Sequence, residues 1–374
     1  MDHRITKMAE VLVGYSVALR PGETVYVEAF DVPTPVLEAL LEQIHRADAI
    51  PLISQKSFRL LRKCLLYASG ESMRSAGHIE LERMKKADAY IGIKAPVNIT
   101  EYADIPALQW DLYHRFWWEP VHIKRRLSQT RWVTLRWPTA AMAQQAGMST
   151  ESFEDLYFKS CTMDYQALSI AMEPLRRLME KTGKVHITGP GTDISFSIKG
   201  IPAIKCDGHL NLPDGEVSTA PVMGSTEGEI SFNVPMTYQG NVLNHITLEF
   251  HQGNVVNFSA SDNQTLDSIL AVDQGARCVG EFALGVNPII RRPMHDILFD
   301  EKISGSLHLA LGNAYPQADN GNRSRIHADM VLLQNPGWGG GTVYFDGVQI
   351  SKDGKFVIEE LNSLNPDSST AFAS

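Results

Sequence analysis

The chain has 374 residues, which is more than one typical hydrophobic core needs, so we expect two domains. Hydrophobic residues make up 44% and charged residues 21%, as in ordinary water-soluble globular proteins. The formal net charge of −9 argues against a nucleic-acid-binding protein, which needs a basic face, and against attraction to an anionic membrane.

The four cysteines lie far apart and form no CxxC motif, which indicates a reducing, cytoplasmic location rather than a disulfide framework or a zinc ribbon. The segment 1–19 carries charges throughout and predicts an amphipathic helix, not a signal peptide. No apolar run is long enough to cross a bilayer, so we expect no membrane span.

Strands and helices alternate along the first third of the chain. Strand-like runs are followed by segments with helical spacing, and Thr34-Pro35 is typical of a helix start. The predicted strands are Glu23–Phe30, Ala49–Ser54, Asp88–Ala95 and Arg131–Leu135, and the predicted helices are Val36–Arg46 and residues 71–87. This alternation predicts an α/β fold with a parallel sheet in an N-terminal domain at residues 1–138. Since no glycine-rich phosphate motif follows the first strand, a nucleotide site is not expected.

The pattern changes twice in the remainder of the chain. Residues 139–183 have helical spacing and predict a helical bridge. From Lys184 onward, short strands with Gly or Asn turns dominate, and one helix is expected over Asp267–Cys278. We therefore expect a β-rich α+β catalytic domain at residues 184–374. The aromatic cluster His114–Trp118 is better explained by core or interface packing than by single-stranded nucleic acid.

The segment Ser306–Met330 concentrates side chains that bind metals. It contains His308 inside an apolar run, Tyr315, and the pair His327 and Asp329. Residues two apart in a strand point to the same face, so His327 and Asp329 would present an imidazole and a carboxylate together. Such groups bind Zn²⁺, Co²⁺, Mn²⁺ or Fe²⁺ well. An isolated HxD pattern, however, is more often a strand with a polar outer face.

Two glutamates in the second half of the chain occupy unusual places. Glu216 is expected in a loop at Asn211–Pro221, and Glu281 begins an otherwise apolar strand, where a carboxylate is costly to bury unless it is paired or bound to metal. With His308, His327 and Asp329, they give three carboxylates and two imidazoles, an inventory that suits two divalent ions. Spacing alone does not show that these side chains converge, since Glu216 and Glu281 lie far apart in the sequence.

Six blocks that occur in order along the chain carry a resemblance to a known family. The sequence resembles the aminopeptidase T family of metallopeptidases over most of its length. The blocks are Gly189–Asp193, Asn211–Val217, Gly275–Arg277 with Gly280-Glu281, Leu298–Lys302, His308–Gly312 with Tyr315, and His327–Met330.

The resemblance implies an enzyme that removes N-terminal residues from peptides with two divalent ions, Zn²⁺, Co²⁺ or Mn²⁺. It also implies a homodimer. The implied metal ligands are Glu216, Glu281, His308, His327 and Asp329, and the implied catalytic residues are Glu216, Glu281 and Tyr315. We expect one glutamate to take up a proton and Tyr315 to donate a hydrogen bond to the oxyanion. Which glutamate bridges the ions and which acts as base stays open, as do the physiological metal and the preferred N-terminal residue.

The main alternative is a mononuclear non-haem Fe(II) dioxygenase of the type that cleaves the ring of dihydroxypyridines. The fold of these related enzymes resembles that of the aminopeptidase T family. His327, Asp329 and a third ligand would suffice for iron. In those enzymes a histidine is expected at the position of Glu281, and no carboxylate is expected at the position of Glu216. Because both glutamates are present, the sequence favours the peptidase. An inactive binding protein is less compatible with a complete ligand set.

Overall fold

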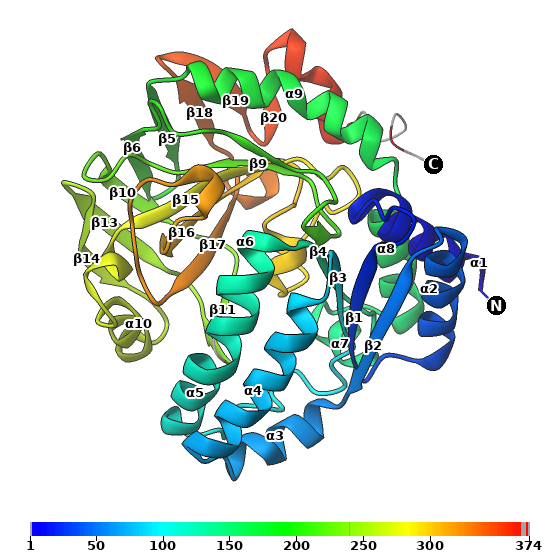
Figure 1. The fold of residues 1–374 in the computed structure, drawn as a ribbon. Coiled ribbons are helices and arrows are strands. Elements are labelled where there is room, and N and C mark those ends of the chain that lie inside the picture. Colours follow the sequence, from blue (N-terminus) through cyan, green and yellow to red (C-terminus); the bar gives the residue numbers. More distant parts are fainter. Residues whose placement is uncertain (1, 239, 368–371, 373–374) are drawn as a thin grey trace. The chain divides into compact units, whose positions relative to one another are not determined.

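The computed structural model describes residues 2–238, 240–367 and 372. The chain forms two compact units (Figure 1), one of Met1–Thr162 with Gly208–Leu212 and the other of Met163–Asp207 with Pro213–Ser374. The first contains a parallel sheet with helices and the second is rich in antiparallel strands, so the predicted fold class is confirmed. Among the described residues, no helix is both long and apolar enough to cross a membrane.

The first unit is built around a parallel sheet of five strands in the order β2-β1-β3-β4-β8. Its strands are β1 (Thr24–Phe30), β2 (Ile50–Lys56), β3 (Ala89–Lys94), β4 (Arg131–Arg136) and β8 (Asn211–Leu212). Figure 1 shows α1 and α2 on one side of β1 and β3, and α4 and α5 on the other. The helices are α1 (His3–Glu10), α2 (Thr34–Arg46), α3 (Phe58–Leu66), α4 (Gly70–Lys85), α5 (Ala107–Tyr113), α6 (Leu127–Gln129), α7 (Ala140–Gln145) and α8 (Thr150–Cys161), with π-helical stretches at Val11–Ser16 and His114–Arg126.

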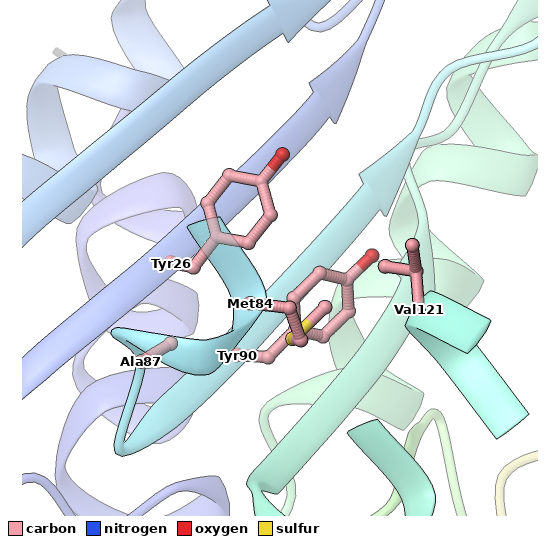
Figure 2. Close-up of a cluster of buried hydrophobic side chains, with 5 residues drawn as sticks. All are labelled: Tyr26, Met84, Ala87, Tyr90 and Val121. Atoms are coloured by element: carbon pink, nitrogen blue, oxygen red, sulfur yellow. The ribbon is translucent and has the colours of Figure 1, made fainter. Parts of the chain in front are cut away.

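One face of this parallel sheet buries a network of ionised and phenolic side chains. Figure 2 shows Tyr26 and Tyr90, from the neighbouring strands β1 and β3, beside Met84 and Val121. The Tyr90 hydroxyl donates to Glu28 (2.5 Å) and the Tyr26 hydroxyl donates to Glu80 (2.7 Å). The Lys56 ammonium joins the two carboxylates, at 2.6 Å from Glu28 and 2.8 Å from Glu80. Trp117, from the predicted aromatic cluster, packs against the same group, so core packing explains this residue.

The second unit is a sandwich of two antiparallel sheets. The larger has eight strands in the order β14-β13-β10-β6-β5-β18-β19-β20 and the smaller has five in the order β17-β16-β15-β9-β7. The strands of the larger are β5 (Lys184–Gly189), β6 (Thr192–Ser197), β10 (Glu227–Ser231), β13 (Thr247–His251), β14 (Asn254–Ser259), β18 (Thr342–Phe345), β19 (Val348–Lys352) and β20 (Lys355–Phe356). Those of the smaller are β7 (Ile204–Cys206), β9 (Glu216–Thr219), β15 (Val279–Gly285), β16 (Ser306–Gly312) and β17 (His327–Leu333). The hairpin of β11 (Met236–Tyr238) and β12 (Asn241–Leu243) and the helices α9 (Tyr165–Lys181), α10 (Asn263–Leu270) and α11 (Ile297–Asp300) complete the unit.

The apolar faces of the two sheets meet in the core of the sandwich. Phe196 of β6 and Phe282 of β15 contact each other edge to face, with ring centroids 5.0 Å apart. In the smaller sheet, Phe282 pairs with Leu309 and Leu309 pairs with Met330, and all three are buried. Paired residues of neighbouring strands share a face, so one face of the smaller sheet is apolar and the alternate residues point away from the core.

Two local expectations about the second half were wrong or incomplete. Glu216 lies not in a loop but at the start of β9, because the turn ends at Gly215 (φ +131°) and Glu216 pairs with Gly285. The helix expected at Asp267–Cys278 is two elements, α10 capped by Asp262 and a 3₁₀ turn (Gln274–Arg277) capped by Asp273. Of the helices in the segment 139–183, α7 and α8 lie in the first unit and α9 lies in the second, and the helical bridge stays a prediction.

A further boundary expectation also differs, since α2 starts at Thr34 itself with Pro33 as its N-cap. Proline at the N-cap is followed by proline in the first turn, and neither needs a backbone donor there. The domain boundaries at 138 and 183 stay predictions.

The buried network predicts how the first unit responds to acid. Burial alone would raise the pKa of Glu28, but the Lys56 ammonium and the Tyr90 hydroxyl outweigh it and lower that pKa to about 2 from 4.5. Glu28 therefore stabilises the fold above pH 4.5, and this contribution of about 3 kcal/mol is lost as the pH falls towards 2. We expect Glu28→Gln to lower stability at pH 7 and to flatten the loss of stability below pH 4.5.

Tryptophan fluorescence measures this unit, because five of the six tryptophans lie in residues 110–137. Glu38→Gln, at an exposed position of α2, is the matched control and should follow the wild-type acid profile. A Glu28→Gln profile with the wild-type slope below pH 4.5 would contradict the assigned role.

Candidate metal centre

Strand register brings the five predicted ligands to one face of the smaller sheet. His308 and Ala310 lie two residues apart on β16 and therefore share a face. Ala310 pairs with Asp329 of β17 on one side and with Glu281 of β15 on the other. Gly312, two residues after Ala310, pairs with His327. Gly285, four residues after Glu281 and so on the same face of β15, pairs with Glu216. Cross-strand partners project to the same side, so all five side chains leave the face opposite the Phe282 core.

A β-bulge at Gly280 sets the direction of the Glu281 side chain. Val279 pairs with Leu311 and Glu281 pairs with Ala310, so Gly280 is an extra residue on β15. Because of this extra residue, the Val279 side chain lies on the apolar face with that of Leu311, whereas the Glu281 side chain lies on the ligand face. A Cβ at position 280 would collide with the carbonyl oxygen of Gly312 and would lie 2.8 Å from that of Asn313.

The first cluster of ligand atoms consists of Glu281, His327 and Asp329, which lie within 4.8 Å of one another. The Nε2 atom of His327 is 3.2 Å from Glu281 Oε2 and 3.2 Å from Asp329 Oδ1. The other ring nitrogen, Nδ1, lies 2.8 Å from the carbonyl oxygen of Asn313, to which it donates as an N–H. A backbone acceptor on Nδ1 fixes the ring and directs Nε2 into the cluster, as outer partners of metal-binding histidines do.

The second cluster consists of Glu216, Glu301 and His308, again within 4.8 Å of one another. His308 Nδ1 lies 3.5 Å from Glu216 Oε2, and His308 Nε2 lies 3.9 Å from both Glu281 Oε1 and Asp329 Oδ1. The imidazole of His308 is therefore placed between the two clusters and directs one nitrogen towards each.

Several polar atoms of these clusters are buried without a hydrogen-bond partner within the described part of the chain. They are both ring nitrogens of His308 and Glu216 Oε2, and Asp329 Oδ1 has only ion pairs, the shorter with His327 Nε2 at 3.2 Å. Burial of an unpaired polar atom costs free energy, about 1–3 kcal/mol each and more for charged groups. Carboxylate oxygens and imidazole nitrogens are the donors that Zn²⁺, Co²⁺ and Mn²⁺ accept, so the residues present fit divalent ions.

The charges of the first cluster reinforce one another. Burial alone would lower the pKa of His327, but the carboxylates of Asp329 and Glu281 outweigh it and hold that pKa well above its usual range. Burial alone would raise the pKa of Asp329, yet His327 and His308 lower it to about 2. In this charge state a proton on His327 balances the carboxylates, and ion binding at Nε2 would release that proton.

Tyr315 lies beside the first cluster, as the sequence suggested. Its ring contacts that of His327, with centroids 4.7 Å apart. The positive charge of His327 would lower the pKa of Tyr315, but loss of hydration around the phenol and the charges of Glu281 and Asp329 outweigh it and raise that pKa above its usual range, although the residue as a whole is 42% exposed. The phenol therefore keeps its proton at neutral pH and is available as a hydrogen-bond donor.

Sequence reasoning missed Glu301, which belongs to the second cluster, and Lys302 and Asp214, which lie beside it. The Lys302 ammonium is fully buried, 2.5 Å from Glu216 Oε1, 2.7 Å from Glu301 Oε1 and 3.4 Å from Asp214 Oδ1. Glu301 and Lys302 belong to the block Leu298–Lys302 that carries part of the family resemblance, but no role was assigned to them. A usable signal was the charged run Asp300–Lys302 between the apolar residues Phe299 and Ile303.

The polar loop Gln317–Ser324, between the two histidine strands, is fixed to the protein by its own amides. Asn322 Nδ2 donates to the carbonyl oxygens of Gly275, Cys278 and Gly312 at 3.0, 3.2 and 2.6 Å. Asn320 Nδ2 donates to those of Pro221 and Val279. The loop is thus held against the turn that precedes β15.

Comparison with known proteins assigns the family. Residues 1–356 match the sequence model of the family described as thermophilic metalloprotease (M29). The chain belongs to this family. The predicted recognition and the predicted class of enzyme, a metallo-aminopeptidase that uses divalent metal, are confirmed, and the ring-cleaving dioxygenase is not favoured.

The relatives differ in how much of their length is matched. The chain is 24% identical to Aminopeptidase PepS of Streptococcus thermophilus over 95% of this chain and 98% of that protein. It is 36% identical to Aminopeptidase 2 of Geobacillus stearothermophilus over 39% of this chain and 37% of that protein. The match to Aminopeptidase AmpS of Bacillus subtilis is 29% identical over 39% of each chain.

A solved structure supports the fold. The structure of wild-type AmpT from Thermus thermophilus superposes with a TM-score of 0.81 at 20% identity, over 95% of this chain and 99% of that one. At this identity the likeness establishes the fold alone, a parallel-sheet α/β part followed by a β-rich part.

The bulge at Gly280 yields a prediction for the site. We expect Gly280→Ala to lower the midpoint of thermal unfolding and the affinity for Zn²⁺, because the new methyl group forces β15 away from Gly312 and turns Glu281 out of register. Overpacking of this kind costs roughly 1–3 kcal/mol. Differential scanning calorimetry and zinc titration of the metal-free protein measure the two effects.

Gly337→Ala is the matched control, since a Cβ at Gly337 meets nothing within 4 Å. This variant should behave as wild type in both measurements. Wild-type zinc affinity in Gly280→Ala would show that the bulge does not orient Glu281.

Proposed function

We propose that this metallo-aminopeptidase hydrolyses the first peptide bond of a peptide, and that each cluster would hold one divalent ion, which together would supply an activated water. The observation that carries the proposal is the buried imidazole of His308, which directs an unpaired nitrogen towards each of two three-residue clusters. The proposed ligands are those predicted, Glu216, Glu281, His308, His327 and Asp329, with Glu301 added to the second cluster.

The bound ions, Zn²⁺, Co²⁺ or Mn²⁺, would supply an acidified water, a Lewis acid for the scissile carbonyl and a ligand position for the free α-amine. A requirement for that amine accounts for removal of N-terminal residues. The curated relatives are named aminopeptidases, and this supports a peptide substrate.

The side chains have distinct roles in the proposed reaction. Glu281 faces both clusters, with Oε1 3.9 Å from His308 Nε2 and Oε2 3.2 Å from His327 Nε2. Within the described chain it forms ion pairs with these histidines and not with a lysine or arginine. One oxygen of Glu216, Oε1, is held by the Lys302 ammonium, so this carboxylate is less free to approach the water. We therefore assign proton uptake from the water, and its transfer to the leaving amine, to Glu281. Tyr315 keeps its proton and donates a hydrogen bond to the oxyanion.

We also propose a homodimer in the cytoplasm, as the family resemblance implies. The wide spacing of the cysteines supports a reducing compartment. The net charge of −9 argues against nucleic acid and against an anionic membrane as partners.

Two substitutions test the assigned function. Glu281→Gln and His327→Ala should each lower kcat/KM for aminoacyl-p-nitroanilides by at least about a hundredfold, because the first removes the proton acceptor and the second removes a ligand. Release of p-nitroaniline is followed by absorbance, and N-acetylated substrates should not react. Oxygen uptake is recorded in parallel with dihydroxypyridine.

Surface residues of the same unit provide matched controls. Glu249→Gln and His251→Ala change exposed positions of β13 and should keep wild-type activity. All four variants should retain the wild-type circular dichroism. Full activity of Glu281→Gln, or consumption of O₂ with ring cleavage, would overturn the proposal.

A further inference from the structure

A third cluster of ligand atoms lies next to the proposed metal centre. Cys206, Asp214 and Glu216 have ligand atoms within 4.8 Å of one another, and all three residues have little exposure to water. Glu216 belongs to this cluster and also to the cluster with Glu301 and His308. The ligand types of the third cluster would by themselves suit a further ion. Its role therefore depends on a feature that distinguishes it from the other clusters.

The distinguishing feature is the ammonium group of Lys302. It lies 2.5 Å from Glu216 Oε1 and 3.4 Å from Asp214 Oδ1, both members of the third cluster. It also lies 2.7 Å from Glu301 Oε1 in the second cluster. A fully buried ammonium among three carboxylates is a cation already in place, attached to the chain by its own side chain.

Hydrogen bonds hold the backbone around Lys302. The Asn287 amide donates to the carbonyl oxygen of Lys302 (3.0 Å), and Asn287 and Ile303 form an isolated bridge. On the preceding turn, Asp300 accepts a hydrogen bond from the Met294 amide at 2.6 Å. Lys302 therefore extends into the site from a turn that backbone hydrogen bonds hold in place.

The contacts of Lys302 divide the oxygens of Glu216 between two tasks. Oε1 binds the ammonium, whereas Oε2 is buried without a hydrogen bond and faces His308 Nδ1 at 3.5 Å. One oxygen is thereby held and the other is left for an ion. The same ammonium holds one oxygen of Glu301, so it orients both carboxylates of the second cluster.

We propose that Lys302 is a positioning residue that takes the place of a third ion and presents Glu216, through Oε2 alone, to the ion of the Glu216–Glu301–His308 cluster. This inference rests on the proposed function for the number of ions. It requires that loss of the ammonium weaken ion binding at that cluster, although the same loss makes the site more negative. A lysine that merely offsets charge would have the opposite effect, because ion affinity would then rise.

The test is zinc titration by calorimetry on the metal-free, full-length protein, with Co²⁺ absorption as a second readout. Lys302→Met keeps the length of the side chain and removes its charge. We expect the affinity of one ion to fall about 10- to 100-fold, as for other partners of metal ligands, and the affinity of the other ion to change little. The Co²⁺ bands of the weakened site should shift, since Glu216 is no longer restricted to one oxygen.

A double variant separates positioning from charge and also protects against misfolding. In the wild type, Asp214, Glu216, Glu301 and Lys302 sum to −2 when ionised, and Lys302→Met alone gives −3. Asp214→Asn with Lys302→Met restores −2, so it should fold even if the single variant does not. We expect this double variant to remain weakened at one ion, while Asp214→Asn alone stays close to wild type.

Lys355→Met, at an exposed position paired with Asp367, is the matched control and should leave both affinities unchanged. Unchanged or higher affinity in the double variant would overturn the role of Lys302. The proposed function fails separately, if the wild type binds a single ion. In that case Lys302 is still judged by whether the affinity of this ion falls in the double variant.

Discussion

The two faces of the smaller sheet of the second unit carry opposite chemistry, and the rest of that unit depends on this division. One face presents Phe282, Leu309 and Met330 to the larger sheet, where Phe282 meets Phe196. The other face presents the carboxylates and imidazoles. Since the side-chain period of a strand is two, the packing that fixes the register of the apolar face also fixes the positions of the ligands. The apolar core thus supports the site from the opposite face of the sheet.

The ligand face is costly in the absence of cations. Glu216, Glu281, Glu301 and Asp329 are carboxylates with little or no exposure to water, and burial of ionised groups is favourable only when they are paired or coordinated. The structure offsets part of this cost with the ammonium of Lys302 and with the imidazole of His327, whose pKa is held high. Divalent ions would offset the remainder, so ion binding and the stability of this unit are expected to be linked.

The sequence was informative where a residue type is expensive to bury. His308 in an apolar run, His327 and Asp329 two residues apart, and Glu281 at the head of a strand each signalled unusual chemistry, and the family resemblance grouped them with Glu216. The structure brings these side chains together, which spacing could not establish for groups so far apart in the sequence. The alternation of strands and helices likewise predicted the parallel sheet of the first unit.

Other features depended on contacts between distant parts of the chain. Lys302 and Glu301 look like a solvated turn in sequence, because adjacent opposite charges usually lie at the surface. The flanking apolar residues hint at burial, but the partner of Lys302 appears only in the structure, where Glu216 at the start of β9 lies against its ammonium. Glu216 was expected in a loop for a similar reason, since its partner Gly285 belongs to a strand much later in the sequence. The bulge at Gly280 has no signal besides a glycine, and its effect on Glu281 appears only in the register of β15 and β16.

The central claim is that the ligand face holds two divalent ions, one for each cluster that His308 joins. Anomalous scattering from crystals of the zinc-loaded protein, recorded on both sides of the zinc absorption edge, tests it most directly. The account predicts two peaks on the ligand face, one against Glu281, His327 and Asp329 and the other against Glu216, Glu301 and His308. A single peak at His327 and Asp329, or a peak among Cys206, Asp214 and Glu216 in place of the Lys302 ammonium, would contradict it.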